Sequence, residues 1–301
     1  MKKKTTKTAA ANKKLTVKNI FLFVKSVVSS ALLVMIINST LIQASRVPTG
    51  SMENTILIGD FLFINKFLYG PSTPQSIPFT NIELPYIQLP GIKDPKLNEI
   101  IVFRFPGNRD EIKAEKIDYY VKRCVGTPGD TVQVINKVLY VNGKQFPIPP
   151  NIKYERWEIY PPHLIEPGIF PIGSNWNGDN YGPIVVPKKG DVIKLSVDNI
   201  DAWATFINRE NGEAVVNIVG DEILIEGKPV ESYTVQNDCY FMMGDNRDNS
   251  LDSRYWGFVP RKNIAGSPLI VFWSWDPSIS FMEPFRLLSS VRLDRIAKLV
   301  D

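Results

Sequence analysis

A mostly apolar stretch of 23 residues near the N-terminus, residues 20–42, restricts most strongly how this chain can fold. At a rise of about 1.5 Å per residue, a helix of this length covers a hydrocarbon core of about 30 Å. Seven lysines precede Ile20, and a lysine-rich flank is typical of the cytoplasmic side. The sequence therefore predicts a cytoplasmic tail over residues 1–19, a single-pass helix in the inner (plasma) membrane over 20–42, and an extracytoplasmic chain beyond it.

A cleaved signal peptide and a buried core helix are the alternatives for this stretch. A signal peptide needs small residues at −3 and −1, and cleavage after Ala44 would put Ile42 at −3. Cleavage after Ser45 would put Gln43 there. The lysine-rich flank argues against a core helix, so an uncleaved anchor in a lipid bilayer is expected.

The net charge of +4 comes from the N-terminal part of the chain. Nine of the 35 basic residues precede Glu53, the first acidic residue, so the remaining chain holds 26 basic against 31 acidic residues and carries −5. A basic face for nucleic acid is therefore excluded as the main function, and no nucleic-acid partner is expected.

After the anchor, short alternating apolar runs are separated by Gly-Asp, Pro-Gly and Asn-Gly, which is typical of antiparallel sheets. Two runs that end in turn residues, 138–143 and 222–229, predict hairpins. The fold class is therefore mainly β, an antiparallel β-sheet domain behind one helix. Other predicted strands cover 61–64, 100–105, 131–134, the run that holds Lys122, and the run that holds Val271, Trp273 and Trp275.

Two proline-rich stretches, 71–97 and 145–190, predict long loops or a cap. His163, the single histidine, lies in the second stretch and is expected to be a solvated loop residue. Residues 285–300 space apolar residues among arginines and predict a short basic amphipathic helix.

A hydrolase with one loop histidine needs a base other than imidazole for its nucleophile. The chain has neither Cys-x-x-Cys nor His-Glu-x-x-His spacing, so no metal and no cofactor are expected. Cys124 and Cys239, the only cysteines, show no framework spacing, and two buried free thiols are favoured over a disulfide.

Four segments taken together identify a family. In this order behind an N-terminal anchor, they resemble the bacterial type I signal peptidases, or leader peptidases, over residues 45–145 and 236–275. The resemblance implies a catalytic β domain over 43–145 and 236–301, with an inserted variable subdomain over 146–235. The four segments are Pro48-Thr49-Gly50-Ser51-Met52, residues 59–66, residues 122–130 and residues 244–257.

The resemblance implies a serine endopeptidase in which Ser51 is the nucleophile and Lys122 the general base. A free lysine has a pKa near 10.4, so a base at neutral pH must lose about two units, roughly 3 kcal/mol. Val121 and Cys124 beside Lys122 allow the burial that this loss requires.

The resemblance also assigns supporting residues. Ser250 would hydrogen-bond the lysine amine, and the Thr49 hydroxyl would join the Ser51 N–H in holding the oxyanion. Asp252 and Arg254 would form a buried ion pair that holds the Ser250 loop. A solvated loop is expected for the three charged residues Asp245, Arg247 and Asp248.

The substrates implied are secretory preproteins, cut after small residues of the Ala-x-Ala type. A substrate strand would bind beside the site, and Val47 and Val121 match positions that line its shallow pockets. The alternative is a membrane-anchored, peptide-binding relative without activity. Such a protein would lack Ser51, Lys122 or Ser250, and all three are present.

Overall fold

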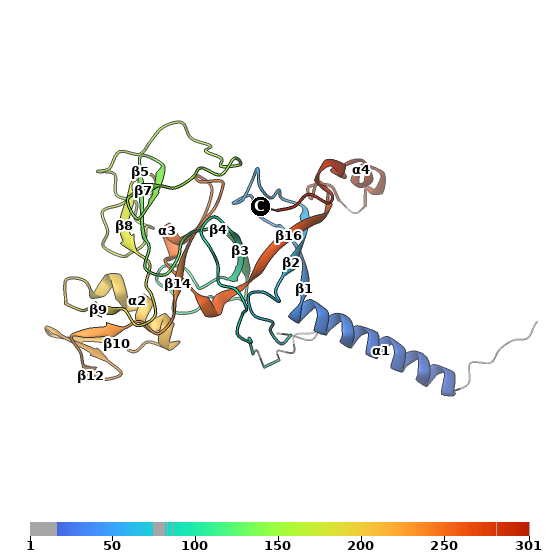
Figure 1. Cartoon of the computed structure of the whole chain (residues 1–301), viewed down its shortest axis with the longest axis horizontal. Coiled ribbons are helices and arrows are strands. Elements are labelled where there is room, and N and C mark those ends of the chain that lie inside the picture. Colours follow the sequence, from blue (N-terminus) through green and yellow to red (C-terminus); the bar gives the residue numbers. More distant parts are fainter. Residues whose placement is uncertain (1–16, 75–81, 83, 86, 281, 301) are drawn as a thin grey trace, which may run out of the picture.

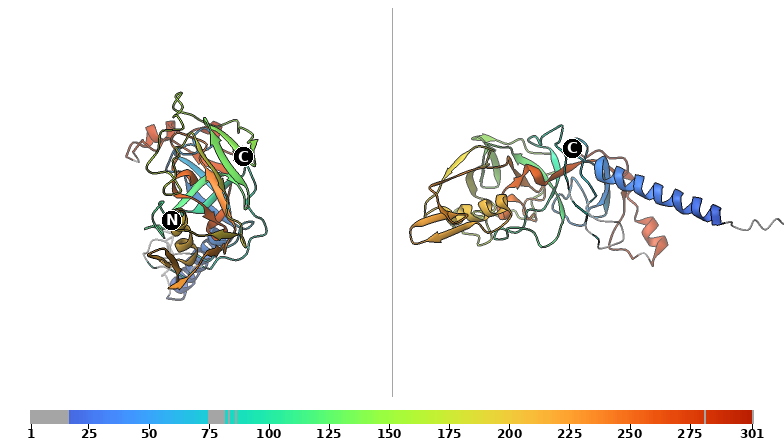
Figure 2. Two further views of the ribbon diagram at one scale, coloured as in Figure 1. Left: turned by 90° about the vertical axis from the view of Figure 1, so that its left-hand side faces the viewer. Right: turned by 90° about the horizontal axis from the view of Figure 1, so that it is seen from below.

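The computed structural model describes residues 17–74, 82, 84–85, 87–280 and 282–300, and the statements below concern those residues. The molecule is elongated: helix α1, Val17–Thr40, projects from one end, and the β10–β12 sheet lies at the other (Figure 1, Figure 2). Helix α1 is the one helix in this part of the chain that is long and apolar enough to cross a membrane.

The helix leads directly into the sheet. It ends at Thr40, two residues before the predicted end, and β1 (Ile42–Arg46) begins after a single turn residue. Ile42 already pairs with Asn65 of the neighbouring strand, so sheet hydrogen bonding replaces helix there. The junction is fastened by a hydrogen bond from the Lys66 N–H to the Leu41 carbonyl, at 2.9 Å.

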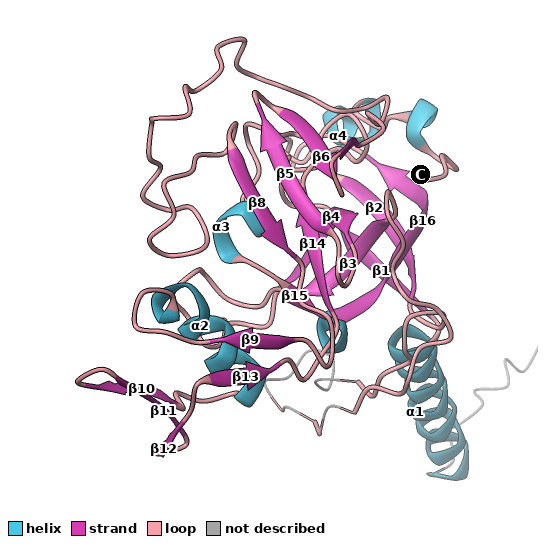
Figure 3. Cartoon of the chain, turned by 60° about the vertical axis from the view of Figure 1, so that its left-hand side comes forward, coloured by secondary structure: helices cyan, strands magenta, loops and turns pink. Residues whose placement is uncertain are grey.

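A seven-stranded antiparallel sheet forms the centre of the molecule, in the order β1-β2-β16-β3-β4-β14-β15 (Figure 3). The prediction of a mainly antiparallel β fold is confirmed. The strands not yet given are β2 (Asp60–Asn65), β3 (Ile100–Arg104), β4 (Tyr119–Gly126), β14 (Cys239–Met243), β15 (Val259–Pro260) and β16 (Ile264–Ser274).

Three smaller sheets extend the molecule away from α1. A four-stranded sheet has the order β7-β6-β5-β8, a three-stranded sheet the order β10-β11-β12, and β9 pairs with β13. Both predicted hairpins are present, as β6–β7 and β11–β12. The strand bounds are β5 Thr131–Ile135, β6 Val138–Val141, β7 Lys144–Gln145, β8 Tyr181–Val185, β9 Val192–Lys194, β10 Val216–Val219, β11 Glu222–Ile225, β12 Lys228–Pro229 and β13 Ser232–Thr234.

Short helices complete the chain: α2 (Ile200–Asn211), α3 (Ser253–Trp256), α4 (Pro284–Ser289), and the 3-10 turns η1 (Arg261–Asn263) and η2 (Leu293–Arg295). Strand β8 lies within the proposed variable segment 146–235 but pairs with β5, which lies outside it. The division of the chain into a catalytic domain and an insertion therefore stays a prediction.

Strand β3 is buried on both faces because it separates two hydrophobic clusters. Ile101 and Phe103 pack into one cluster, and Ile100 and Val102 pack into the other. The neighbouring strand β4 is thereby held at the centre of the sheet, between β3 and β14. A site built on β4 consequently rests on rigid backbone.

The prediction of a helix over 285–300 is correct only as far as Ser289 and wrong beyond it. Helix α4 ends at Ser289, and the chain then returns to the sheet, where Leu299 bridges to Ile270 of β16. The cause is Arg295, which is 5% exposed and forms a buried ion pair with Asp60 at the start of β2. A continuous helix would carry this side chain away from Asp60.

Replacing Arg295 with alanine should therefore lower the free energy of unfolding by about 3–5 kcal/mol, because Asp60 would be left as an uncompensated buried charge. Urea unfolding of the chain in detergent measures the loss. Arg286→Ala is the matched control, since its ion pair with Glu283 is exposed and should contribute little. Equal effects of the two substitutions would contradict the assignment.

Candidate active site

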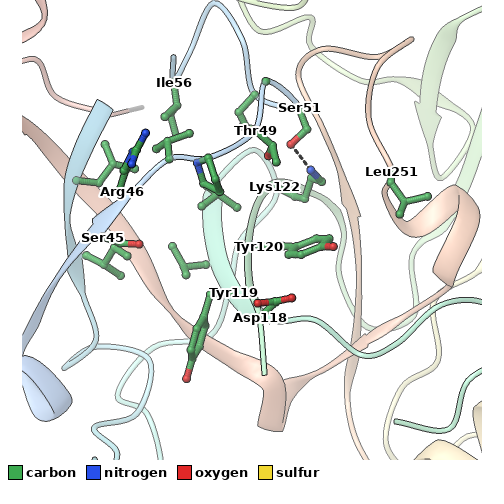
Figure 4. Close-up of a pocket in the computed structure, with 18 of the residues that line it drawn as sticks. Ser45, Arg46, Thr49, Ser51, Ile56, Asp118, Tyr119, Tyr120, Lys122 and Leu251 are labelled. Carbon is green, nitrogen blue, oxygen red and sulfur yellow. Dashed lines mark hydrogen bonds between the residues drawn. The ribbon is translucent and has the colours of Figure 1, made fainter. Parts of the chain in front are cut away.

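Ser51 lies in a tight turn between β1 and β2 (Figure 4). The Glu53 N–H donates to the Gly50 carbonyl at 3.0 Å, and the Ile56 N–H donates to the Met52 carbonyl at 2.8 Å. Met52 and Ile56 are buried in the hydrophobic cluster under the sheet, so they anchor the turn from below. The Ser51 side chain is left on the open side.

Lys122 approaches Ser51 from strand β4, 71 residues later in the chain. A hydrogen bond joins Lys122 Nζ to Ser51 Oγ (Figure 4). The lysine is only 3% exposed. The structure thus brings together the two side chains predicted from the sequence, although one lies in a turn and the other on strand β4.

Burial lowers the pKa of Lys122 from 10.5 to about 8. Desolvation is the main cause, because it penalises the ammonium form. The Asp252 and Asp245 carboxylates act in the opposite direction, and the Arg254 guanidinium favours the neutral amine. A large share of the lysine is therefore neutral slightly above physiological pH, as proton acceptance from a hydroxyl requires.

The loop that follows β14 packs against this pair, and its first acidic residue is completely buried. Asp245 forms a two-pronged ion pair with Arg123, at 2.9 Å to Nε and 2.7 Å to Nη2. It also accepts a 2.6 Å hydrogen bond from the Thr55 hydroxyl. Asp245 thereby joins strand β4, one residue from Lys122, to the turn that holds Ser51.

The expectation of a solvated loop is wrong for Asp245 and Arg247, which are buried, and Asp248 is half-buried and held in ion pairs. Asp248 pairs with Lys137 at 3.0 Å and accepts a 2.9 Å hydrogen bond from the Arg156 N–H. The residues that cover the loop come from segments outside it, which is why the charged run gave no sign of burial.

The expected ion pair between Asp252 and Arg254 is present and buried, with Oδ2 and Nη2 2.9 Å apart. Burial alone would raise the pKa of Asp252, but the charge and hydrogen bonds of Arg254 outweigh it and hold this pKa below its usual value. Asp252 also accepts a 3.1 Å hydrogen bond from the Gly244 N–H. Asp252 is thus bonded to Gly244 at the start of the loop and to Arg254 just after its end.

Ser250 lies beside the nucleophile turn, but the expected hydrogen bond to Lys122 is absent from the described part of the chain. Its hydroxyl is buried and has no partner there. A Cβ added to Gly244 would lie 2.2 Å from Ser250 Oγ and 2.5 Å from the Ser51 carbonyl. Glycine is thus required at position 244 for Ser250 and Ser51 to lie so close.

A groove of about 420 Å³ opens beside Ser51 and Lys122 (Figure 4). Thr49, Val47 and Val121 all line it. Strand β14 pairs with β4 only from Arg123 onward, so within the described residues no strand covers that edge of β4 over residues 120–122. The groove therefore offers apolar walls and an edge of β4 to an extended chain.

Two residues that support the nucleophile turn were not predicted. The Asn246 N–H donates to the Ser51 carbonyl at 3.0 Å, and its side-chain amide donates to the Gly50 carbonyl at 3.2 Å. Lys153 forms an isolated parallel bridge with Asn246 and an ion pair with Glu53 at 2.9 Å. Asn246 lies within a recognised segment, but Lys153 lies where the resemblance is loose and offered no signal.

The remaining reactive residues lie away from the groove. His163 is exposed and does not line it. Cys124 and Cys239 are buried and free, as favoured from the sequence.

Comparison with known proteins gives one consistent result. The family model described as signal peptidase, peptidase S26, matches residues 20–273. Signal peptidase I of Buchnera aphidicola (subspecies Schizaphis graminum) is 33% identical, covering 81% of this chain and 72% of that protein. The same enzyme of Pseudomonas aeruginosa is 31% identical, with 84% and 72% covered, and that of Aquifex aeolicus is 29% identical, with 87% of each covered.

A solved structure of signal peptidase I from Enterococcus faecalis covers 58% of this chain and 97% of its own, at 23% identity. Its TM-score is 0.25, so the superposition adds nothing to the argument.

The lysine pKa is directly measurable. Carbon-13 NMR of lysine-labelled protein should show Lys122 titrating near pH 8. Lys153 is the control: its hydrogen bonds to Glu53 and Glu155 raise its pKa above 10.5. Titration of both lysines near the ordinary value would refute the desolvation of Lys122.

Proposed function

The chain belongs to the signal peptidase family, peptidase S26, and on that premise we propose that it removes N-terminal signal peptides from secreted preproteins, with Ser51 as nucleophile and Lys122 as general base. The hydrogen bond between Lys122 Nζ and Ser51 Oγ carries this proposal. The lowered pKa of Lys122 supports it, because a lysine that is partly neutral can accept the serine proton.

In the first step, neutral Lys122 takes the proton of Ser51 Oγ while the oxygen attacks the carbonyl carbon of the scissile bond. The resulting lysine ammonium then gives this proton to the leaving amine, and the signal peptide stays attached to Ser51 as an ester. In the second step, Lys122 takes a proton from water, and the hydroxide so formed attacks the ester. Collapse of the second intermediate returns the proton to Ser51.

The Ser51 N–H and the Thr49 hydroxyl are proposed to hold the oxyanion. The Ser51 N–H has no acceptor among the described residues, so it is free to donate to the tetrahedral intermediate. Thr49 lines the same groove two residues earlier. Ser250 is proposed to orient the lysine amine once substrate binds, because catalytic hydrogen bonds often tighten only in the complex.

Substrate specificity is proposed to reside in the groove. An extended peptide would add to the uncovered edge of β4, with backbone hydrogen bonds providing affinity. Its side chains would point toward walls that include Val47, Ile56 and Val121. Small residues before the cut, as in Ala-x-Ala, suit such shallow apolar pockets.

Helix α1 is proposed to be the anchor, with the N-terminus in the cytoplasm and the catalytic part outside. Nine residues separate Ile42 from Ser51, which span at most about 30 Å when extended. The nucleophile is therefore tethered close to the membrane surface. A preprotein held in the bilayer by its apolar segment would present its cleavage site at that level.

Substitution of either proposed catalytic side chain should abolish cleavage. Ser51→Ala and Lys122→Met should each lower kcat at least about 10³-fold on a preprotein with an Ala-x-Ala site. Methionine keeps the volume of the buried lysine, so loss of folding is avoided. Lys189→Ala, on the surface, is the control and should stay near wild type. Substantial activity in either catalytic variant would exclude the dyad, and full inactivity of the wild type would favour a peptide-binding relative.

The pH dependence follows from the direction of the lysine shift. Because only neutral Lys122 can accept a proton, kcat/KM should rise about tenfold per pH unit below pH 8 and level off above it. A pH profile of the purified enzyme between pH 6 and 10 measures this. A rate that is already constant at pH 6 would rule out a lysine base.

A further inference from the structure

The Arg247 side chain is an unpaired cation inside the protein. Arg247 is 5% exposed, and its Nε is buried without a hydrogen-bond partner. Among the described residues, its guanidinium donates one weak hydrogen bond, from Nη1 to the Met243 sulfur at 3.7 Å. An arginine carries five N–H donors, so most of its hydrogen-bonding capacity is unused.

The carboxylates near Arg247 are already engaged by other cations. Asp245 pairs with Arg123, and Asp252 pairs with Arg254. The next acidic residue, Asp248, pairs with Lys137 and also accepts a hydrogen bond from the Arg156 N–H. No carboxylate in this part of the structure is left for Arg247. A buried guanidinium without a carboxylate is costly, so a ligand that supplies one would bind strongly.

A cavity of about 170 Å³ lies against this side chain. Its walls are mostly apolar and come from the hairpin strand β6 and the proline-rich segment after β7. The residues lining it are Lys137, Val138, Leu139, Phe146, Pro147, Ile148, Pro149, Ile152, Tyr154 and Arg247. Lys137 also faces this space, but its ammonium is engaged by Asp248 and the Arg156 carbonyl.

The size and chemistry of the cavity restrict what it can hold. A dry cavity of about 150 Å³ accommodates benzene, so this one has room for roughly six non-hydrogen atoms. One available guanidinium and apolar walls suit a carboxylate with a short hydrocarbon chain. Phosphate fits less well, because it carries more charge and has no apolar part.

We propose that this cavity is a binding site for a small aliphatic carboxylate, whose carboxylate pairs with Arg247 and whose chain packs against Val138, Ile148 and Ile152. The guanidinium can bind the carboxylate with two parallel hydrogen bonds. The site is separate from the Ser51 groove, with which it shares no lining residue. It is also independent of the proposed peptidase activity.

The site adjoins the loop that carries Ser250. The Arg247 N–H donates to the Lys153 carbonyl at 2.9 Å, and the Arg247 carbonyl accepts a hydrogen bond from Arg254 Nη2 at 2.7 Å. The Arg247 backbone is thus held between the segment at Lys153 and the Asp252–Arg254 pair. A ligand on the Arg247 side chain would therefore stabilise the loop that carries Ser250.

Binding of butyrate to the full chain in detergent micelles tests the site by NMR or calorimetry. Two further probes separate the contribution of the hydrocarbon chain from that of the charge. Acetate lacks most of the hydrocarbon chain, and 1-pentanol has the same number of non-hydrogen atoms as butyrate but no charge. Butyrate should bind at least about tenfold more tightly than either. Equal affinity for butyrate and 1-pentanol would refute a role for the Arg247 charge.

A matched pair of variants locates the site. Ile148 is 70% exposed at the cavity, so Ile148→Asp and Ile148→Asn should both fold. The aspartate should weaken butyrate binding about tenfold more than the asparagine, because it repels the ligand and competes for Arg247. Arg247→Gln should abolish binding, and the Ile148 pair remains decisive if that variant does not fold. Binding that is insensitive to Ile148→Asp but lost in Lys122→Met would place butyrate in the active-site groove and overturn the proposal.

Discussion

The whole site depends on keeping one lysine buried, with a pKa low enough that part of it is neutral near physiological pH. Two acidic residues near Lys122, Asp245 and Asp252, each favour its ammonium form. Each carboxylate pairs with its own arginine, Arg123 or Arg254. Arg254 offsets part of the field that the carboxylates exert, and desolvation remains the largest influence on the pKa of Lys122. The same two ion pairs also hold the loop that carries Ser250. Three of these four side chains therefore both influence the pKa of Lys122 and fix the position of this loop.

Much of this arrangement could be predicted from the sequence. Strands β2, β5 and β6 follow the apolar alternation closely, since burial on one sheet face produces a period of two, whereas β3 and β14 are buried on both faces. The contact between Ser51 and Lys122 was predictable only through the family resemblance, because no local pattern links residues 71 positions apart. The helix end was misplaced by two residues, because Ile42 is apolar enough for the membrane and also pairs in β1.

Buried charges were the part that the sequence could not predict. The run from Asp245 to Asp252 contains charged and polar residues that are normally solvated, and nothing local indicates otherwise. Their burial depends on partners such as Lys137 and Arg123 that lie more than a hundred residues away. The helix predicted over 285–300 failed for the same reason. The spacing of Arg295 suits a helix, but its ion pair with the distant Asp60 requires the chain to turn back toward the sheet.

The direct passage from α1 into β1 fixes the distance between the nucleophile and the end of the helix. With α1 proposed to lie in the bilayer, the chain between Ile42 and Ser51 is held as an edge strand and a tight turn, so Ser51 sits at a set level above the lipid. Confinement to that level reduces the search for substrate to two dimensions and raises the effective concentration of any bond at the same height. Under the proposed anchoring, a peptide bond further from the surface would escape cleavage even if its side chains fit the groove.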